Sequence, residues 1–478
     1  MPQPFAINFG PWVPDGADVV VGMPNQYAPA TIPLADCLNV YWSDQGYRSL
    51  SGYGVFSNAL SSQCLGAFTA LDVSTARLYC GTSSDLFYFP GAPPTNVSKS
   101  AGAYTGTTFW SFAQFGGCIC AANGVTVLQD MTLGGANFAD LTGSPIARVL
   151  GVIGQSLMAG DIVSPTAYPY RVQWSGIGNP TSWPTPLTNA AIAVQSGYQD
   201  LTQEFGHVMF IAGGPLRGVL FQQLGITLAT YQGGDVVFSF QPFERKRGLI
   251  ARGAACQVGD VTHFIGTDGF YMTDGSQVIP TGSSTDGGLG IDKWFKSNVN
   301  LNALSAISSG YDSTLKCVAW AIPTGSNTLP DTLLLLNPRD ARWTRASLSS
   351  ELIWSDIDSN TRHRLSVFDQ THKFGYLNAA APSGYVETYD GAFLDGRVRD
   401  VVEGQLNGLC TDTPTMKIGY RESLEDAVTY SAANTPDSFS RRVTWDPPPA
   451  GRFVRVNAAS AAASALNGAT IYTELGGV

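Results

Sequence analysis

The residue types that most often do chemistry in proteins are sparse and scattered in this chain. It contains no G-x-S-x-G nucleophile elbow, no phosphate-binding loop and no H-E-x-x-H metal motif. Its four histidines are scattered, at His207, His263, His363 and His372. We expect His263, within a strand-like segment, to be a core residue with a satisfied side chain. His363 and His372 flank a hairpin beside cationic residues, which favours a solvated or interface surface over a proton relay.

Carboxylates could support glycoside hydrolysis or calcium binding, but their spacing favours neither. Asp and Glu fall mostly at turns, where they cap loops, whereas glycosidases need paired carboxylates across a pocket. Ser283–Gly287 resembles the Asp-box of sialidases, yet the motif occurs once and lacks the closing Thr-Trp. Asp268 and Asp274 precede glycines in tight turns, without the D-x-D-x-D-G spacing of a calcium loop. The sequence therefore predicts no enzyme activity, no metal and no cofactor.

The eight cysteines mostly lie in apolar, strand-like runs, which predicts buried free thiols. Cys118 and Cys120 form a C-x-C pair whose side chains would share one face of a strand. No second Cys/His pair lies at zinc-ligand spacing, so this pair does not indicate a zinc site.

Two sets of residues are candidates for contacts with partners. Arg245, Lys246 and Arg247 form the sharpest basic cluster, which is too short for a nucleic-acid tract. A subunit interface or a turn is the favoured interpretation, and direct DNA contact is the alternative. Trp174 and Trp183, together with Trp110, are candidate exposed aromatics that could surround a glycan pocket.

The elements that would position these residues are predominantly strands. Segments such as Val261–Pro280 alternate apolar residues around Asp-Gly turns and are typical of β-hairpins. Hairpins begin near residues 78, 118, 152, 208, 263, 317 and 365, about 48 residues apart, close to the repeat of propeller blades. We therefore predict an all-β fold, with a β-propeller of six or seven blades over residues 61–382.

The segments outside the propeller have a different texture. Residues 1–60 are rich in proline and glycine with little periodicity, and predict an extended N-terminal arm. Residues 383–478 predict a separate C-terminal β-sandwich-like domain. One amphipathic helix stands out, because Ile291, Trp294, Phe295 and Val299 share one face; we expect it to pack on the rim of a blade.

Composition and net charge limit the classes of partner that the chain could bind. Charged residues make up 13% of the chain, about half the usual share, and the net charge is −10. Neither the first 382 residues nor the remainder has the basic excess of a nucleic-acid clamp. No apolar run approaches the length of a membrane span, and the N-terminus shows no secretory signal. We expect a soluble protein made in a cytoplasm.

Several segments, taken in order, resemble the tail hub, or nozzle, proteins of short-tailed bacteriophages, also called packaged-DNA stabilisation proteins. Each segment is generic alone, so the shared order and length carry the resemblance. The segments are Asp36–Tyr41, Gly46–Gly54, Arg171–Trp183, Arg247–Ile250, Phe264–Tyr271, Ile279–Phe295, Leu333–Trp343, Arg441–Val443 and Gly451–Val456.

The resemblance implies a structural virion protein, assembled in the host cytoplasm, without catalytic residues. It implies a ring of six copies below the portal and adaptor, with fibre, plug or needle proteins as further partners. Double-stranded DNA would pass through the ring during ejection without specific binding. A neutral or acidic wall would let it slide. A receptor- or glycan-binding tail propeller is the alternative. The chain departs from the family in its few lysines and in its Ala/Ser-rich end.

Overall fold

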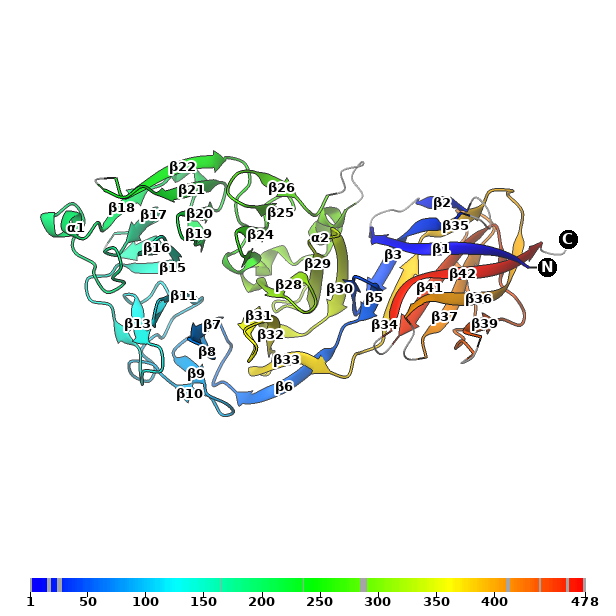
Figure 1. The fold of residues 1–478 in the computed structure, drawn as a ribbon, viewed down its shortest axis with the longest axis horizontal. Coiled ribbons are helices and arrows are strands. Elements are labelled where there is room, and N and C mark those ends of the chain that lie inside the picture. The colour runs from blue at the N-terminus through cyan, green and yellow to red at the C-terminus, as the bar shows by residue number, and fades with distance from the viewer. Residues whose placement is uncertain are drawn as a thin grey trace.

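The computed structural model describes residues 2–14, 19–23, 28–164, 166–234, 236–283, 290–409, 413–437, 440–460 and 464–475. Two β-rich bodies lie end to end in an elongated molecule (Figure 1). One is a β-propeller, and the other is a smaller β domain that carries both chain termini at its far end. The described residues form seven four-stranded blades, which confirms the predicted all-β propeller and fixes its blade number.

Each blade is an antiparallel sheet whose strands run in chain order from the propeller axis outward. Blade 7 differs in its outermost strand, which comes from early in the chain. The strands of blades 1 to 4, from inside to outside, are β7 (Gly66–Asp72), β8 (Thr75–Gly81), β9 (Leu86–Phe89) and β10 (Thr95–Asn96); β11 (Ser111–Phe115), β12 (Cys118–Ala122), β13 (Gln129–Thr132) and β14 (Ala139–Asp140); β15 (Ile146–Ile153), β16 (Ser156–Ser164), β17 (Tyr168–Trp174) and β18 (Gly197–Asp200); and β19 (Val208–Ala212), β20 (Arg217–Gln222), β21 (Ile226–Tyr231) and β22 (Phe238–Glu244). Those of blades 5 to 7 are β23 (Ala255–Val258), β24 (Val261–Ile265), β25 (Phe270–Thr273) and β26 (Val278–Pro280); β27 (Ser308–Asp312), β28 (Cys317–Ile322), β29 (Thr332–Asn337) and β30 (Arg342–Ser347); and β31 (Ser350–Ile357), β32 (His363–Asp369), β33 (Lys373–Ala379) and β6 (Gly52–Ala59).

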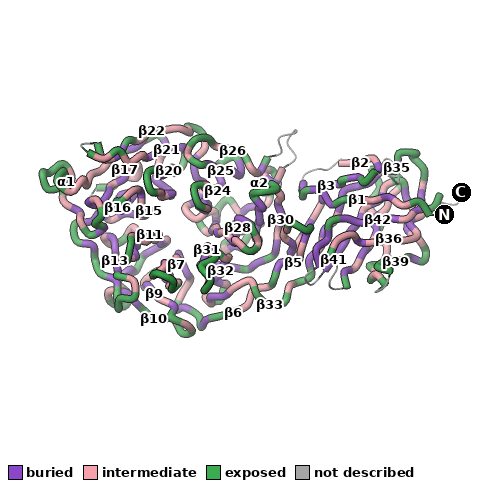
Figure 2. The backbone as a smooth tube through the Cα atoms, in the orientation of Figure 1, coloured by how far each residue is buried: buried purple, intermediate pink, exposed green. Residues whose placement is uncertain are grey.

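Turn chemistry and burial on both faces explain these blades. The Asp274-Gly275 turn closes β25 onto β26, with Gly275 at φ +85 and Ser276 N donating to Asp274 Oδ1 at 2.8 Å. Strand β28 is buried along its whole length because blades 5 and 7 cover both of its faces. Such strands therefore show continuous apolar runs instead of alternation. Figure 2 shows buried residues concentrated in the interior of both bodies.

The ring closes in blade 7, where β6 pairs antiparallel with β33. Gly52 lies opposite Ala379, so the chain enters and leaves the propeller at one point. The boundary predicted at residue 60 is therefore wrong by one strand, because Gly52–Ala59 belongs to the propeller. Its burial is patchy, with Val55 and Phe56 exposed, as expected for an outermost strand.

The second body is one sheet of 14 strands among the described residues. The aromatic rings of Phe5 on β1 and Phe393 on β35 are in contact, although the two strands are not neighbours in the sheet. The sheet therefore curls around a core. The strands are β1 (Gln3–Trp12), β2 (Val20–Met23), β3 (Ala30–Leu38), β4 (Val40–Ser43), β5 (Gly46–Ser49), β34 (Gly384–Thr388), β35 (Asp390–Phe393), β36 (Arg399–Leu409), β37 (Thr415–Arg421), β38 (Thr429–Tyr430), β39 (Arg442–Thr444), β40 (Ala450–Gly451), β41 (Phe453–Ser460) and β42 (Ala465–Leu475).

The prediction of an extended N-terminal arm is wrong, because these residues form strands of the β domain. Strand β1 lies between β3 and β42 in the centre of the β domain, with Phe5, Ile7 and Phe9 buried. The prolines suggested an irregular arm, yet Pro11 falls at a register shift between Phe9 and Trp12, where a residue without an N–H is tolerated. The N-terminal residues therefore complete the domain that the C-terminal residues begin.

Helices are few. The predicted amphipathic helix is α2 (Ile291–Asn298), with Ile291 and Phe295 buried against the propeller. Its Trp294 contacts Trp12 of the β domain at 5.4 Å between ring centroids, so the helix also reaches the domain junction. Helix α1 (Asn189–Ala193) lies at the opposite end of the molecule (Figure 1). No helix in the described ranges is long and apolar enough to cross a membrane.

Ring closure generates a testable prediction. A Cβ on Gly375 of β33 would lie 2.1 Å from the carbonyl oxygen of Gly54 on β6, so an alanine there forces the closing strand away. We expect Gly375→Ala to lower the free energy of unfolding of the propeller by about 1–3 kcal/mol. The measurement is urea unfolding followed by circular dichroism. Gly91→Ala is the matched control, because nothing lies within 4 Å of its added Cβ; equal effects of both variants would contradict the closure model.

Candidate functional site

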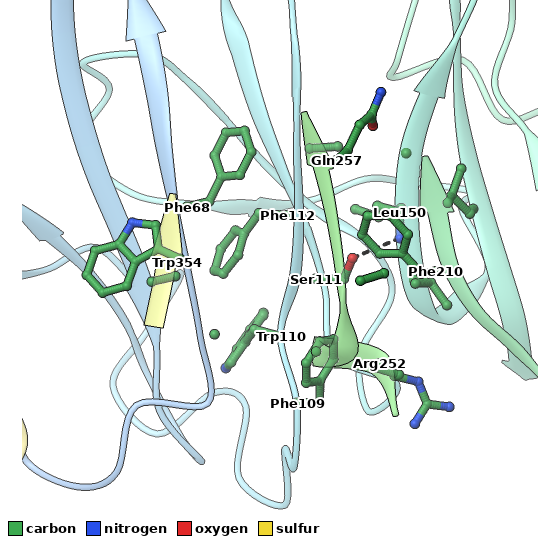
Figure 3. Close-up of a pocket in the computed structure, with 18 of the residues that line it drawn as sticks. Phe68, Phe109, Trp110, Ser111, Phe112, Leu150, Phe210, Arg252, Gln257 and Trp354 are labelled. Carbon is green, nitrogen blue, oxygen red and sulfur yellow. Dashed lines mark hydrogen bonds between the residues drawn. The ribbon is translucent and has the colours of Figure 1, made fainter. Parts of the chain in front are cut away.

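One cavity lies on the propeller axis and is lined by residues on or beside the inner strands of all seven blades. Several of these residues are drawn in Figure 3. The cavity has a volume of about 480 Å³, and its wall is mainly aromatic and aliphatic, with Phe68, Phe112, Phe210 and Trp354. An adjoining space of about 690 Å³ shares Phe109, Met209 and Arg252 with this cavity. Arg252 is the one charged side chain among the described residues that line either space. The channel is therefore an apolar space without acid–base groups.

A buried carboxylate, Asp161 of β16, fastens the blades around the channel mouth. Its oxygens lie 3.2 Å from Nη1 of Arg148 and 3.1 Å from Nδ1 of His207, and they also accept a hydrogen bond from Arg252. Arg148 comes from blade 3, His207 precedes blade 4 and Arg252 precedes blade 5. Asp161 has a φ of +55 at an irregularity of β16, which turns its side chain toward these partners. With its oxygens occupied, Asp161 is a clamp between blades.

Two more buried carboxylates fasten the closing blade to blade 1. Glu351 accepts hydrogen bonds from Cys64 N at 3.0 Å and from Nδ1 of His372 at 2.5 Å, and its burial raises its pKa. Asp356 accepts from Thr69 Oγ1 at 2.7 Å and pairs with Arg364 at 2.8 Å. Both carboxylates hold structural partners. His372 is thus half-buried and paired, and only His363 has the exposed position that was predicted for both.

The basic cluster divides into two parts. Arg247 is half-buried, 3.5 Å from Asp268 and 3.7 Å from Glu244, and its guanidinium lies over the Tyr271 ring. It stabilises the turn between blades 4 and 5. Arg245 and Lys246 are exposed. Their role in a subunit interface stays a prediction.

The predicted exposed aromatics are wrong. Trp174 is 7% exposed, Trp183 is 6% exposed and Trp110 is 2% exposed. Their indole nitrogens donate to the carbonyl oxygens of Gln195, Pro180 and Thr82 at 3.0, 2.7 and 2.8 Å. Each ring fills a core between or within blades. The sequence places a tryptophan on a strand or loop but does not show whether that face meets solvent or the next blade.

The cysteines and turn aspartates that the sequence offered as candidate metal or reactive residues have structural roles, where they lie in the described residues. Cysteines 37, 64, 80, 120, 256 and 317 are buried free thiols, Cys118 is half-buried, and Cys410 lies outside the described residues. Within the described ranges no group of three or more His, Cys, Asp and Glu residues could hold a metal. Asp274 shapes its own turn. Most of the Asp-box-like segment, residues 284–287, lies outside the described residues.

The junction between the two bodies is built from paired charges. Asp36 of β3 forms a bidentate ion pair with Arg345 of β30, at 2.8 and 3.0 Å from its Nη2, and accepts from Tyr385 Oη at 2.6 Å. Arg342 of β30 donates to the carbonyl oxygen of Phe9 at 3.1 Å and lies over the Trp42 ring at 3.9 Å. Bidentate arginine contacts fix orientation as well as distance. These contacts hold the β domain firmly against blade 6.

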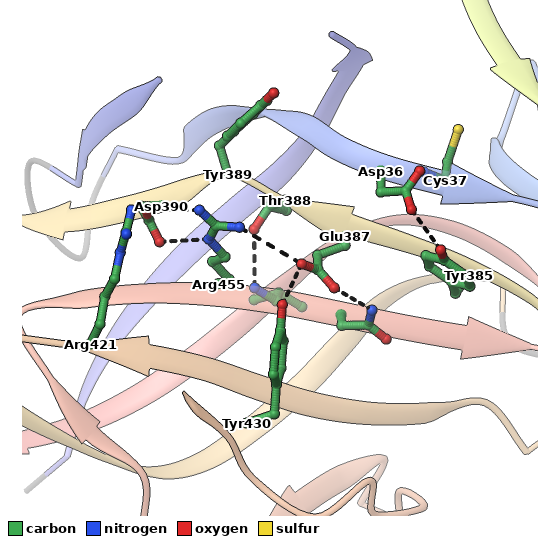
Figure 4. A network of polar contacts seen from close by, with 12 residues as sticks. Asp36, Cys37, Tyr385, Glu387, Thr388, Tyr389, Asp390, Arg421, Tyr430 and Arg455 are labelled. Atoms are coloured by element: carbon green, nitrogen blue, oxygen red, sulfur yellow. Dashed lines mark hydrogen bonds and ion pairs between the residues drawn. The ribbon is translucent and has the colours of Figure 1, made fainter. Parts of the chain in front are cut away.

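A second network stiffens the β domain itself (Figure 4). Asp390 accepts from Arg421 and from Arg455 Nε, the latter at 2.7 Å. Glu387 accepts from Tyr430 Oη at 2.5 Å and from Asn457 Nδ2 at 2.8 Å. These residues tie together β34, β35, β37, β38 and β41. The sequence showed no signal for this network, because its members are separated by up to 70 residues.

His263 of β24 was expected to be a satisfied core residue. It is 4% exposed, but its Nδ1 has no hydrogen-bond partner among the described residues. Burial lowers the pKa of its imidazole to about 4. The side chain is therefore neutral at physiological pH.

Comparison with known proteins adds the following. No protein-family model matches the chain, and no curated protein matches it. Among solved structures it is similar to the extracellular domain of BT4673 from B. thetaiotaomicron, with 9% identity, a TM-score of 0.44, and coverage of 68% of this chain but 39% of that one. It is also similar to the computationally designed Ika8 protein, with 9% identity, a TM-score of 0.40, and coverage of 77% and 99%. The WD40 repeats of RRP9 match with 10% identity, a TM-score of 0.39, and coverage of 66% and 92%.

The Asp161 clamp predicts a large stability effect. Asp161→Asn removes the charge that compensates two arginines and leaves them facing a neutral side chain. We expect a loss of about 1–3 kcal/mol in the free energy of unfolding, because buried hydrogen bonds lose a charged acceptor while the arginines stay partly exposed to water. Urea unfolding measures it. The exposed pair Arg245→Ala/Lys246→Ala is the control and should change stability by no more than about 0.5 kcal/mol per residue. A small effect of Asp161→Asn would show that the clamp does not stabilise the ring.

His263 predicts a pH dependence. Its pKa is about 4 in the folded protein against 6.5 in the unfolded chain, so the unfolded state binds more protons between these values. This group's contribution is complete above pH 6.5 and falls by about 3 kcal/mol as the pH drops toward 4. In His263→Met the stability difference between pH 7 and pH 4 should shrink by that amount. Unchanged pH dependence would contradict the assignment; His363→Gln, at an exposed site, is the control.

Proposed function

We propose that this chain is a structural subunit of the tail hub, or nozzle, of a short-tailed bacteriophage. Six copies would form a ring below the portal and adaptor, retain packaged DNA and guide its ejection. The protein would then be part of the virion, assembled in the host cytoplasm, with the fibre and plug or needle proteins as neighbours. It would act without catalysis.

The main observation in support of the proposal is the position of the segments that resemble the tail hub family. Asp36–Tyr41, Ile279–Phe295 and Leu333–Trp343 are up to 300 residues apart in sequence, yet they meet at the domain junction. Arg345 lies two residues after the third segment and pairs with Asp36 of the first. A subunit of a ring that withstands DNA pressure needs two bodies held in one orientation, and this junction supports that role.

The chemistry of the propeller is compatible with a structural role. The described buried carboxylates of the propeller are Asp161, Asp312, Glu351 and Asp356. Each holds protein partners, so the proposal needs no reaction at them. The axial channel of about 480 Å³ is far too small for a DNA duplex. The conduit would therefore lie between copies of the chain, along the axis of the ring.

The chain's charge also favours free passage of DNA. A wall rich in lysine and arginine would bind phosphates in a salt-dependent way, whereas a neutral or acidic wall repels them. The net charge of −10 fits the second kind of wall. The alternative function, receptor or glycan binding, loses the three tryptophans that suggested it, since all three are buried.

The proposal predicts a closed ring whose lumen carries more Asp and Glu than Lys and Arg. Arg245 and Lys246 should lie at a subunit boundary, away from the lumen. Native mass spectrometry of the purified chain and cryo-electron microscopy of the ring test this. We expect Arg245→Glu/Lys246→Glu to weaken the ring, because like charges would then meet at the boundary. Arg217→Glu/Lys293→Glu, the same charge change at other exposed positions, should not.

Two results would contradict this prediction in different ways. A chain that stays monomeric at all concentrations would remove the ring and with it the proposed function. A ring whose lumen is lined by Arg245 and Lys246 would show that the protein grips DNA, so the sliding mechanism would be wrong.

A further inference from the structure

A second cavity lies at the junction of the β domain, blade 5 and helix α2. Its volume is about 370 Å³, and it is distinct from the axial channel. Trp12 enters it from the β domain, while His263, Met272 and Thr281 enter from blade 5 and the segment that follows it. Trp343 of blade 6 completes the wall. No Asp, Glu, Lys or Arg is among the described residues that line it.

Three polar atoms of this wall are buried without a hydrogen-bond partner among the described residues. They are Nε1 of Trp12, Nδ1 of His263 and Oγ1 of Thr281. Trp12 and His263 are 3% and 4% exposed, so bulk water does not reach their side chains freely. Buried polar groups in native proteins are nearly always paired, and each exception calls for a missing partner. The neighbouring Trp343 shows the ordinary case, since its Nε1 donates to the Thr281 carbonyl oxygen at 2.8 Å.

The chemistry of the wall defines what would fit. Trp12 Nε1 can only donate, the Thr281 hydroxyl can donate or accept, and the neutral His263 imidazole can do either. The remaining surface is apolar, with indole rings and aliphatic side chains such as Met272 and Leu336. Charged molecules would find no counter-charge among the described lining residues and would lose their hydration. A volume of about 370 Å³ lies within the range of small-molecule sites.

We propose that this cavity binds an uncharged, mostly apolar small molecule that carries a hydrogen-bond acceptor facing Trp12 Nε1. Its polar points would satisfy the three unpaired atoms, and its body would fill space that water wets poorly. Because Trp12 belongs to one body and His263 and Thr281 to the other, the bound molecule would bridge the domain junction. It would therefore stabilise the two-domain arrangement by mass action. This site does not depend on the proposed ring.

The test uses 6-propionyl-2-(dimethylamino)naphthalene, an uncharged apolar dye with one ketone acceptor. The full chain, with its indoles labelled with ¹⁵N, is titrated with the dye while the indole N–H signal of Trp12 is followed. We expect that signal to shift and saturate. Trp12→Phe keeps a ring but removes the donor, and should weaken dye binding about three- to tenfold. Trp174→Phe is the matched control, because it removes an indole remote from the cavity and should leave dye affinity unchanged.

A second variant makes the test independent of one substitution. Met272→Trp places a large side chain in the cavity and should abolish the response at Trp12, and Thr281→Val replaces Trp12→Phe if that variant fails to fold. Circular dichroism checks folding of each. The proposal is overturned if the Trp12 signal stays fixed while the dye binds elsewhere, such as the axial channel. It is also overturned if folded Trp12→Phe and Met272→Trp bind the dye as wild type does, because the dye would then occupy another site.

Discussion

Closure of the propeller ring is the constraint on which the rest of this structure depends. Each blade packs its faces against its neighbours, so the first and seventh blades are covered on both faces only when they meet. Blade 7 is itself completed by a distant segment, because its outer strand β6, from residues 52–59, pairs with β33, from residues 373–379. Two segments more than 300 residues apart must therefore find each other before the propeller has a continuous core. The buried pairs of Glu351 and Asp356 lie at this same seam.

Closure also explains the second body. Because the chain enters at Gly52 and leaves at Ala379 side by side, the sequences before and after the propeller emerge together. Strand β1 lies between β3 and β42, so N-terminal and C-terminal residues share one sheet. The paired arginines Arg342 and Arg345 of β30 then fix this sheet against blade 6. The geometry of the domain junction is thus a consequence of how the ring is closed.

In a chain with so few charges, the buried charges are used as fasteners. Asp161 joins three blades at the channel mouth, and Asp390 joins strands of the β domain. Such pairs gain little net stability over apolar packing, but a missing partner is costly, so they favour one arrangement over its alternatives. The two cavities are left almost free of charge: an apolar axial channel, and a junction cavity whose unpaired polar atoms are all neutral.

The sequence alone determined the all-β class, the hairpins and their spacing, because turn residues and alternating apolar positions act locally; each predicted hairpin start falls in a separate blade. It also located helix α2 from one apolar face. Tertiary structure alone decided which faces are buried, so Trp174 and Trp183 proved to be core residues. It also decided the place of the N-terminal residues and the partners of Asp161, Asp36 and Asp390. Those contacts join positions 13 to 349 residues apart, and local patterns carry no information about such pairs.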